Sequence, residues 1–407
     1  MAAERQPVAF VSGLDTTGYG IVRSLGRAGV SVVALTDQNA DFGRHSTYCR
    51  RFHVSPAFGN EQQVCRLLLD ARSEFDCDPV LFASSDWFAE LLAKHREELA
   101  PRYKFHYVSA QTLARIVDKA EMSRICQQAG VLTPATHVPR PDEDLEKSAR
   151  EFACPCLVKA KRSFNFDFPA GKKNLVFDSP GDLVRFYRSH AGLLGTTIWQ
   201  EIIPGGHDQI FACTVLIRQS GEVGAVFGIQ KIRQYPEFGI MSYGRSQENE
   251  AVASESLRLL RLLDYRGFAD MEFKRGSDGR YYFIEMNPRL PRFCSLFQDA
   301  GVNLPYLGYL DLIGQEDSPA FQGKPRPGVC WLSFSDDIGS YYHARKKREL
   351  GLWRWLRWLA AARSHAWWNW RDPRPFFAAA THLMEVIARK LIHSLGFFAQ
   401  RRAGDAE

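Results

Sequence analysis

The sequence predicts an α/β protein in which a doubly wound parallel sheet comes first and an α+β region with antiparallel strands follows. Apolar runs at 8–11 and 30–35 flank a helical repeat, which is the pattern of a β-α-β unit, and the apolar run at 80–83 precedes another helical repeat. The antiparallel part is predicted by a hairpin pattern at 269–288, where polar and apolar residues alternate on both sides of Asp278-Gly279.

Length and charge restrict the classes of function. The 407 residues suggest two or three domains. The net charge is +6, but eight Lys/Arg and one Glu fall between 345 and 371, so a general nucleic-acid surface is disfavoured. The nine cysteines form no CxxC pair and no signal peptide is evident, so we expect a cytoplasmic protein with reduced thiols. No apolar run reaches the roughly 18 residues of a membrane span.

Glycines and serines follow the first strands. Gly13, Gly18 and Gly20 stand where a dinucleotide fingerprint would, but their spacing is not G-x-G-x-x-G, so we interpret them as residues of a tight turn and disfavour NAD. The run 84–86, Ser-Ser-Asp, ends a parallel strand, where a substrate contact could lie. A helix cap is the favoured role for any one of these three residues.

Prolines divide the rest of the chain. A helix is predicted over 121–129, a proline-rich stretch at 134–141 marks a junction, and strands at 156–160 and 197–203 flank a helix over 181–190. We expect three units, which are a Rossmann-like domain at 1–117, a catalytic domain at 118–320 with a lid at about 140–198, and a basic, Trp-rich helical extension at 321–407.

The hairpin concentrates acidic residues. If Asp278-Gly279 forms a two-residue turn, Glu272 lies opposite Glu285 and Asp270 opposite Asn287, all on one face. Carboxylates across a ladder repel each other unless a cation lies between them. These oxygen donors suit Mg²⁺ or Mn²⁺. From the register alone, a solvated hairpin face stays an open alternative.

These motifs resemble the ATP-grasp superfamily. Residues 283–289, preceded by 271–273, are similar to its metal-binding end, and Asp118-Lys119, the strand around Lys159 and the segment 199–206 follow in the family's order. The similarity covers roughly residues 1–315. It implies an ATP-grasp fold with an N-terminal Rossmann-like pre-ATP-grasp domain, and the use of ATP and Mg²⁺ (or Mn²⁺).

The resemblance implies roles for the matching residues. Lys119 and Lys159 would reach the nucleotide phosphates, although each by itself could be a solvated surface lysine. The adenine would be lined by Glu201, Ile202 and Ile203, for which an ordinary central strand is the alternative. Asp208 would bind the ribose, with His207 as competitor. The metal ligands would be Glu272, Glu285 and Asn287.

Three cations are candidates for the reaction itself. The resemblance implies that Arg289 stabilises the transferred phosphoryl group. Lys231 and Arg233 share one side of a strand by period two and could bind phosphate or a substrate carboxylate. Exposed charges on an edge strand are an equal alternative for these two.

One segment departs from the family pattern. Many ATP-grasp enzymes cover the phosphates with a glycine-rich loop, because backbone N–H groups must approach closely. Here the segment 162–173 has a single glycine, Gly171, and ends in Lys172 and Lys173. Side-chain charge could replace the backbone donors.

The chain most resembles the carboxylate-amine ligase branch, which implies activation of a carboxylate as an acyl phosphate, release of ADP, and attack by an amine. An envelope or glycan precursor is one candidate substrate. The alternatives are a carboxylase that uses bicarbonate, and a non-catalytic ATP-binding regulatory protein. Substrates are expected to be small molecules, nucleic acid is not expected, and a homo-oligomer is left open.

The extension concentrates tryptophan. Six of the nine Trp residues lie between 353 and 370, and on a helix Leu352, Trp355, Leu356 and Leu359 would share a face opposite arginines. A basic amphipathic helix with aromatic residues fits peripheral membrane contact through 350–371, at the inner face of the membrane. A helical subdomain that packs on the catalytic body is the slightly favoured alternative.

Overall fold

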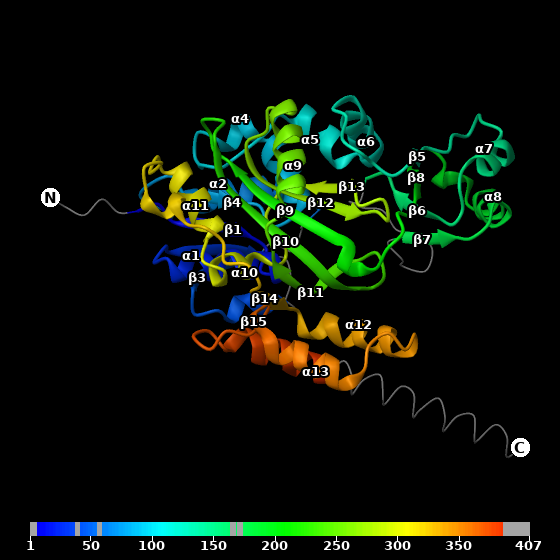
Figure 1. Cartoon of the computed structure of the whole chain (residues 1–407). Helices are drawn as coiled ribbons and strands as arrows, with labels where there is room; N and C mark the ends of the chain where they lie inside the picture. Colours follow the sequence, from blue (N-terminus) through cyan, green and yellow to red (C-terminus); the bar gives the residue numbers. More distant parts are fainter. Residues whose placement is uncertain (1–5, 37–40, 55–58, 163–167, 169–173, 386–407) are drawn as a thin grey trace, which may run out of the picture.

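The computed structural model describes residues 6–36, 41–54, 59–162, 168 and 174–385 (Figure 1). Three sheets organise these residues, and their strand orders are β3-β2-β1-β4, β5-β8-β6-β7 and β13-β12-β9-β10-β11-β14-β15. Short 3-10 turns lie at η1 (Phe42–His45), η3 (Ala191–Leu193), η4 (His207–Gln209) and η5 (Pro319–Gln322). The α/β fold class expected from the sequence is therefore confirmed.

The first sheet is parallel, as predicted from the spacing of apolar runs. Its strands are β1 (Ala9–Ser12), β2 (Val32–Thr36), β3 (Cys49–Val54) and β4 (Val80–Phe82). Its helices are α1 (Thr16–Arg27), α2 (Glu61–Arg72), α3 (Asp86–Lys94), α4 (Arg96–Leu99) and α5 (Ala110–Val117). Strands β1, β2 and β4 are fully buried, which explains why they read as continuous apolar runs rather than as alternating ones.

The glycines after β1 form the tight turn predicted for them. Gly13 has a φ of +80°, and a Cβ on Gly18 would lie 2.1 Å from the carbonyl oxygen of Gly13. Asp15 caps α1 by accepting a hydrogen bond from the Gly18 N–H at 2.9 Å. The turn therefore needs glycine for backbone geometry, independently of any nucleotide.

The second sheet forms the small unit on the right of Figure 1 and is antiparallel. It comprises β5 (Thr136–His137), β6 (Cys156–Ala160), β7 (Asn174–Phe177) and β8 (Thr197–Glu201), with helices α7 (Leu145–Glu151) and α8 (Pro180–Ser189). Trp199 and Tyr187 fill a separate core beneath these helices. The segment predicted as a lid, about 140–198, lies within this unit, and its role as a lid stays a prediction.

The third sheet carries the hairpin. Its strands are β9 (Ile210–Ile217), β10 (Val223–Tyr235), β11 (Ile240–Ser246), β12 (Gly267–Arg275), β13 (Tyr281–Asn287), β14 (Cys330–Leu332) and β15 (Ala362–His365). All of its pairings are antiparallel except that between β14 and β15. Helices α6 (Lys119–Gln128) and α9 (Glu250–Leu262) accompany this sheet. Apolar residues of α6, α9, β9, β12 and β13 make up one continuous core.

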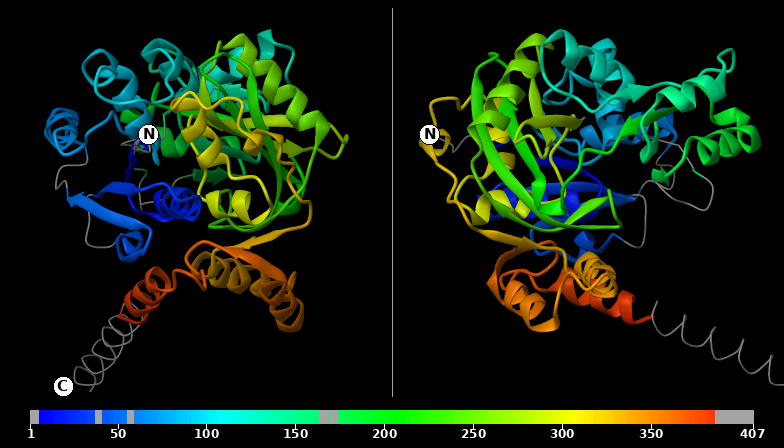
Figure 2. Two further views of the ribbon diagram at one scale, coloured as in Figure 1. Left: turned by 90° about the vertical axis from the view of Figure 1, so that its left-hand side faces the viewer. Right: turned by 45° about the vertical axis from the view of Figure 1, so that its right-hand side comes forward.

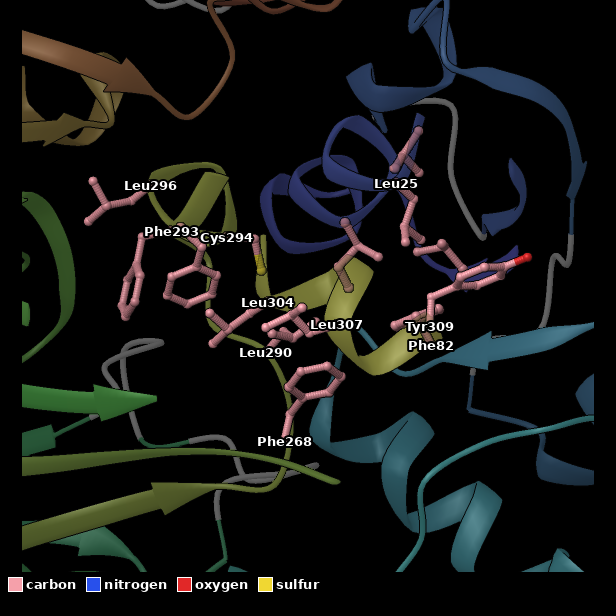
Figure 3. Close-up of a cluster of buried hydrophobic side chains, with 14 of the residues drawn as sticks. Leu25, Phe82, Phe268, Leu290, Phe293, Cys294, Leu296, Leu304, Leu307 and Tyr309 are labelled. Atoms are coloured by element: carbon pink, nitrogen blue, oxygen red, sulfur yellow. The ribbon is translucent and has the colours of Figure 1, made fainter. Parts of the chain in front are cut away.

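A shared core joins the first and third sheets. Helices α10 (Cys294–Asp299) and α11 (Leu304–Leu312) place Phe293 and Leu307 in one core with Leu25 of α1 and Phe82 of β4 (Figure 3). Phe227 of β10 belongs to the same core. The parallel domain and the hairpin sheet are therefore packed as one body, which fixes the carboxyl ends of β1 and β4 relative to the hairpin.

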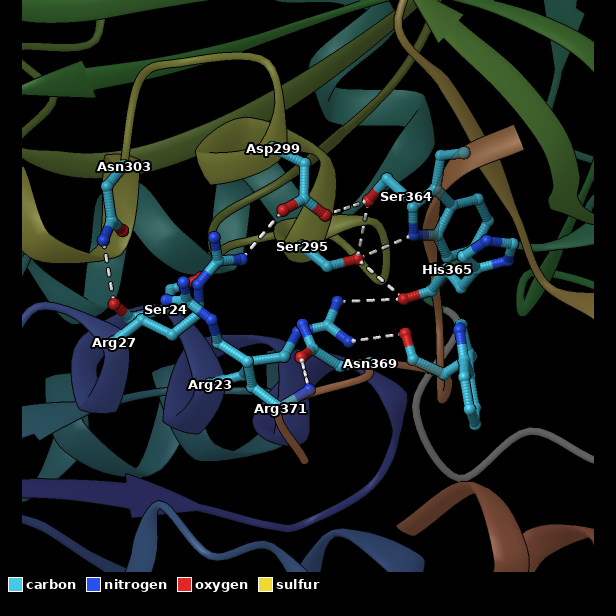
Figure 4. Close-up of polar contacts among 12 residues, drawn as sticks. Arg23, Ser24, Arg27, Ser295, Asp299, Asn303, Ser364, His365, Asn369 and Arg371 are labelled. Atoms are coloured by element: carbon cyan, nitrogen blue, oxygen red, sulfur yellow. Dashed lines mark hydrogen bonds and ion pairs between the residues drawn. The ribbon is translucent and has the colours of Figure 1, made fainter. Parts of the chain in front are cut away.

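The extension is helical, as expected, and also supplies β14 and β15. Its helices, α12 (Phe334–Lys346) and α13 (Leu352–Ala361), form a layer beneath the body (Figures 1 and 2). Arg23 of α1 donates to the His365 carbonyl at 2.9 Å, and Ser364 donates to Asp299 of α10 at 2.7 Å (Figure 4). The extension is thus bonded to both the first domain and the third sheet.

Candidate nucleotide and metal site

The hairpin β12–β13 places acidic side chains in the predicted register. Glu272 pairs with Glu285 and Asp270 pairs with Asn287. The two-residue turn is wrong, because the Gly276 N–H donates to the Arg280 carbonyl and the chain reverses over 276–280. Pairing next to this turn is displaced by one residue, and an irregularity between Glu272 and Phe273 restores the predicted pairing at the acidic end.

Burial makes this acidic face costly for the protein alone. Burial, with Glu272 nearby, raises the pKa of Asp270 to about 7. Burial also raises the pKa of Glu272, against the lowering effect of Lys231. Carboxylates crowded in this way bind a divalent cation favourably, because the cation neutralises them. The oxygen donors of Glu272, Glu285 and Asn287 therefore fit Mg²⁺. These three side chains are half-buried and Asp270 is buried, so a fully solvated hairpin face does not describe them.

Cations from three elements converge on Glu285. Burial alone would raise the pKa of Glu285, but Lys119, Lys159 and Lys231 outweigh it and hold the pKa below its ordinary value. Lys231 Nζ lies 2.5 Å from Glu272 Oε1, and Lys159 Nζ donates to Gln200 Oε1 at 2.8 Å. The structure thus brings the predicted phosphate-binding lysines to the predicted metal ligands.

Local structure explains the positions of Lys119 and Lys159. Lys119 is the first residue of α6, whose N-terminus is capped by Asp118. Lys159 lies on β6, whose register places it opposite Ile198 of β8. Burial lowers the pKa of both lysines, that of Lys159 to about 8. An anionic ligand between α6 and β6 would raise the pKa of both lysines again, because it favours the charged ammonium form.

The predicted adenine residues line one cleft with the acidic face. This cleft has a volume of about 780 Å³ and includes Lys159, Glu201, Ile202, Ile203, His207, Asp208, Glu272 and Glu285. Glu201 accepts a hydrogen bond from the Ala135 N–H at 3.0 Å, so its carboxylate holds the strand that enters the lid. His207 Nδ1 lies 3.0 Å from Gln234 Nε2, and both His207 and Asp208 line the cleft, so the choice between them as ribose ligand stays a prediction.

Lys274 was not singled out from the sequence. Its Nζ donates to the carbonyls of Gly205 at 2.7 Å and Gly206 at 2.6 Å, which fixes the turn after the predicted hinge. Period two along β12 puts Lys274 on the face of Asp270 and Glu272, and this signal was available in the sequence.

Arg289 joins the hairpin to the first domain. Its Nε lies 2.9 Å from Asp86 Oδ1, at the start of α3. The preceding Ser85 caps α3 by accepting from the Phe88 N–H at 3.2 Å. The run 84–86 therefore contains a helix cap, as favoured, and one residue, Asp86, that faces the candidate site.

Arg233 does not join the cluster around Glu285. An irregularity in the β10–β11 pairing separates it from Lys231, and it forms a bidentate ion pair with Asp337 of α12 at 2.8 and 2.9 Å. Arg233 nevertheless lines the same cleft as Glu285, so binding of phosphate or a substrate carboxylate by Lys231 and Arg233 stays a prediction. The edge-strand alternative is wrong, since both side chains are buried on an interior strand.

The far wall of the cleft comes from the extension, which sequence reasoning did not connect with the site. Its contribution consists of Ser340, His343, Ala344, Lys347, Glu349, Leu350, Arg354 and Trp358. Most of the glycine-poor segment 162–173 lies outside the described residues, including Lys172 and Lys173.

Comparison with known proteins agrees with this geometry. Residues 244–304 match the family described as carbamoyl-phosphate synthase L chain, ATP binding domain. The chain is 24% identical over 315 residues to a D-aspartate ligase of Enterococcus faecium, covering 73% of this chain and 74% of that protein.

Solved structures share the fold. The N5-carboxyaminoimidazole ribonucleotide synthetase of Thermus thermophilus aligns with a TM-score of 0.60 at 17% identity, covering 79% of this chain and 81% of that one. The L-amino acid ligase of Bacillus licheniformis aligns with a TM-score of 0.59 at 18% identity, covering 81% and 79%. Among the described residues, none of the helices is both long and apolar enough to cross a membrane.

Proposed function

The chain belongs to the ATP-grasp superfamily, and from that premise we propose that it is an ADP-forming ligase that joins a carboxylate to an amine. The observation that carries the proposal is the convergence of Lys119, Lys159 and Lys231 on Glu285, beside Glu272 in the same cleft. Cations of this kind neutralise transferring phosphoryl groups, and the chemistry needs no protein nucleophile.

The proposed reaction has two steps. A carboxylate oxygen of the first substrate attacks the γ-phosphorus of ATP, the bond to the β,γ-bridging oxygen breaks, and ADP leaves. The amine of the second substrate then attacks the acyl carbon, and phosphate leaves. Lys119 and Lys159 hold the phosphates, and Arg289, oriented by Asp86, holds the transferred group.

Other residues bind and orient. We assign the adenine to the wall at Glu201, Ile202 and Ile203, and the ribose to Asp208. Glu272, Glu285 and Asn287 would hold Mg²⁺, which when bound neutralises charge on the β- and γ-phosphates. Lys231 is placed to keep Glu272 in position through its 2.5 Å ion pair.

Several finer statements remain predictions. The three domain boundaries and a homo-oligomeric state stay predictions made from the sequence. The same holds for a cytoplasmic location and for an envelope or glycan precursor as substrate. D-Aspartate and L-amino acids, which the names of two similar proteins contain, are the first compounds to try.

To test this proposal, the full chain is incubated with Mg-ATP, hydroxylamine and pooled carboxylic and amino acids. The products are identified by mass spectrometry. Carboxylate-dependent ADP and hydroxamate are expected, because hydroxylamine intercepts an acyl phosphate. AMP in place of ADP would refute the phosphoryl transfer.

Two controls separate the alternatives. ADP release that depends on bicarbonate without an organic acid would select the carboxylase alternative, and one structural neighbour is a biotin carboxylase domain in complex with bicarbonate. Tight ATP binding with no turnover in any pool would select a regulatory ATP-binding protein.

A further inference from the structure

We propose that the outer face of α13, formed by Leu352, Trp353 and Leu356, docks on an anionic membrane surface. These side chains are 42%, 78% and 39% exposed, although all three are large and apolar. They lie within one helical turn of each other, so they form one contiguous face. The sequence predicted a single apolar face, whereas the structure shows two.

The inner face of α13 is already occupied. Trp355 stacks on Tyr341 with ring centroids 4.3 Å apart and donates its Nε1–H to Asp337 at 2.8 Å. Trp358 packs edge-to-face on Tyr243 at 5.0 Å. Packing of the extension on the body therefore explains why Trp355 and Trp358 occur at their positions. It does not explain why a tryptophan occurs at the exposed position 353.

Charge identifies the occupant of the outer face. Exposed Arg357 borders this face on α13, and exposed Arg354 lies beyond it toward the cleft. The run 345–348 before the helix adds four exposed cations, of which Lys347 pairs with Glu237. A tryptophan among basic residues fits the interface of an anionic bilayer, where the ring lies at headgroup level. A two-fold contact with a second copy would bring these like charges together, which disfavours self-association.

Docking would place the cleft next to the lipid headgroups. Leu350 and Arg354 line the cleft, and Arg354 directly follows Trp353. The extension also forms the outer layer of the molecule, beneath the third sheet (Figure 2). This step rests on the proposed function, whereas docking itself does not.

The test is cosedimentation of the full chain with vesicles of phosphatidylcholine, or of phosphatidylcholine mixed with phosphatidylglycerol. Pelleting is expected with the mixed vesicles at low salt and not with pure phosphatidylcholine, and high salt should release the protein. Trp353→Ser combined with Leu356→Ser should lower the bound fraction about tenfold, and Arg357→Gln severalfold.

Leu262→Ser is the matched control, because Leu262 is 58% exposed on α9, in another part of the molecule. It should bind like the unchanged chain, and circular dichroism should show all variants folded. No pelleting with mixed vesicles would overturn the proposal. Equal loss of binding in Leu262→Ser, or a dimer in light scattering that Trp353→Ser abolishes, would overturn it as well. Because no substrate is needed, these results are independent of ligase activity.

Discussion

Lys231 and Arg233 stand two positions apart on β10 but pair with different acidic residues, Lys231 with Glu272 and Arg233 with Asp337. Lys231 belongs to the cleft cluster, which we define as Lys119, Lys159, Lys231, Asp270, Glu272 and Glu285. Arg233 belongs to the clamp, which we define as Arg233, Ser242, Asp337 and Trp355. Both regions are buried and charged, but they differ in how completely their charges are satisfied.

The clamp is saturated. The Asp337 carboxylate accepts from Arg233 at 2.8 and 2.9 Å, from Ser242 at 2.9 Å and from Trp355 at 2.8 Å. The cleft cluster is not saturated, since Asp270 has a pKa raised to about 7 and Lys159 one lowered to about 8. Groups with strongly shifted pKa values are typical of sites that bind ligands. A buried ion pair whose hydrogen bonds are all made has a structural role instead.

The largest expected effect is on the cleft cluster. Glu285→Gln removes the carboxylate around which three lysines gather, so we expect ADP formation to fall roughly a thousand-fold. The free energy of unfolding should fall modestly, because the amide keeps the shape of the side chain but leaves the three lysines without this carboxylate. The rate of ADP formation is measured in the reaction mixture that supports turnover, and the free energy of unfolding is measured by denaturant titration.

Asp278→Asn is the matched control, on the same hairpin but in the exposed turn. It should leave the ADP rate within about twofold of the unchanged chain, since surface ion pairs contribute little. Full turnover by Glu285→Gln would refute the assignment of the site.

The second effect concerns the clamp. Asp337→Ala leaves the Arg233 guanidinium buried without its partner, so we expect a loss of about 3 kcal/mol in the free energy of unfolding. The double variant Arg233→Met with Asp337→Leu should recover most of that loss, because no charge stays buried alone. Denaturant titration measures both variants, and a loss below about 1 kcal/mol in Asp337→Ala would show that the clamp is dispensable.

Local pattern was enough to predict the elements and much of the site. Continuous apolar runs gave β1, β2 and β4 because both faces of a parallel sheet are covered. Alternation gave the hairpin, and the pairing of Glu272 with Glu285 holds although the turn does not. The longer turn displaces the register by one residue, and the irregularity beside Glu272 cancels that displacement.

Tertiary contacts decided what could not be predicted. Arg233 and Asp337 are 104 positions apart, and no spacing rule connects them. The pairing of β14 and β15 could not be predicted either, because these short strands join a sheet built from strands earlier in the chain. The two faces of α13 were also indistinguishable in the sequence, since apolar residues occur on both and only the partner helix determines which one is inside.

The smallest expected effect is a pH dependence of ATP affinity, which should come from the cleft cluster and not from the clamp. Burial lowers the pKa of Lys159 to about 8 in the protein alone, and phosphates favour the ammonium form. Below pH 8 Lys159 is already charged, so affinity for ATP should be constant there with respect to this group. Above pH 8 a proton must be taken up on binding, and affinity should fall by up to about tenfold per pH unit.

Lys159→Arg tests whether Lys159 carries this dependence, because a guanidinium stays protonated throughout the range. Isothermal titration of ATP at about pH 7, 8 and 9 should give a steeper loss for the unchanged chain than for Lys159→Arg. Arg233→Lys should leave the pH dependence of ATP affinity as it was, because Arg233 lines the cleft but its charge is already paired with Asp337. If Lys159→Arg kept the full slope, the proton would belong to another group of the cleft cluster, and Lys119, whose pKa burial also lowers, would be the next to change.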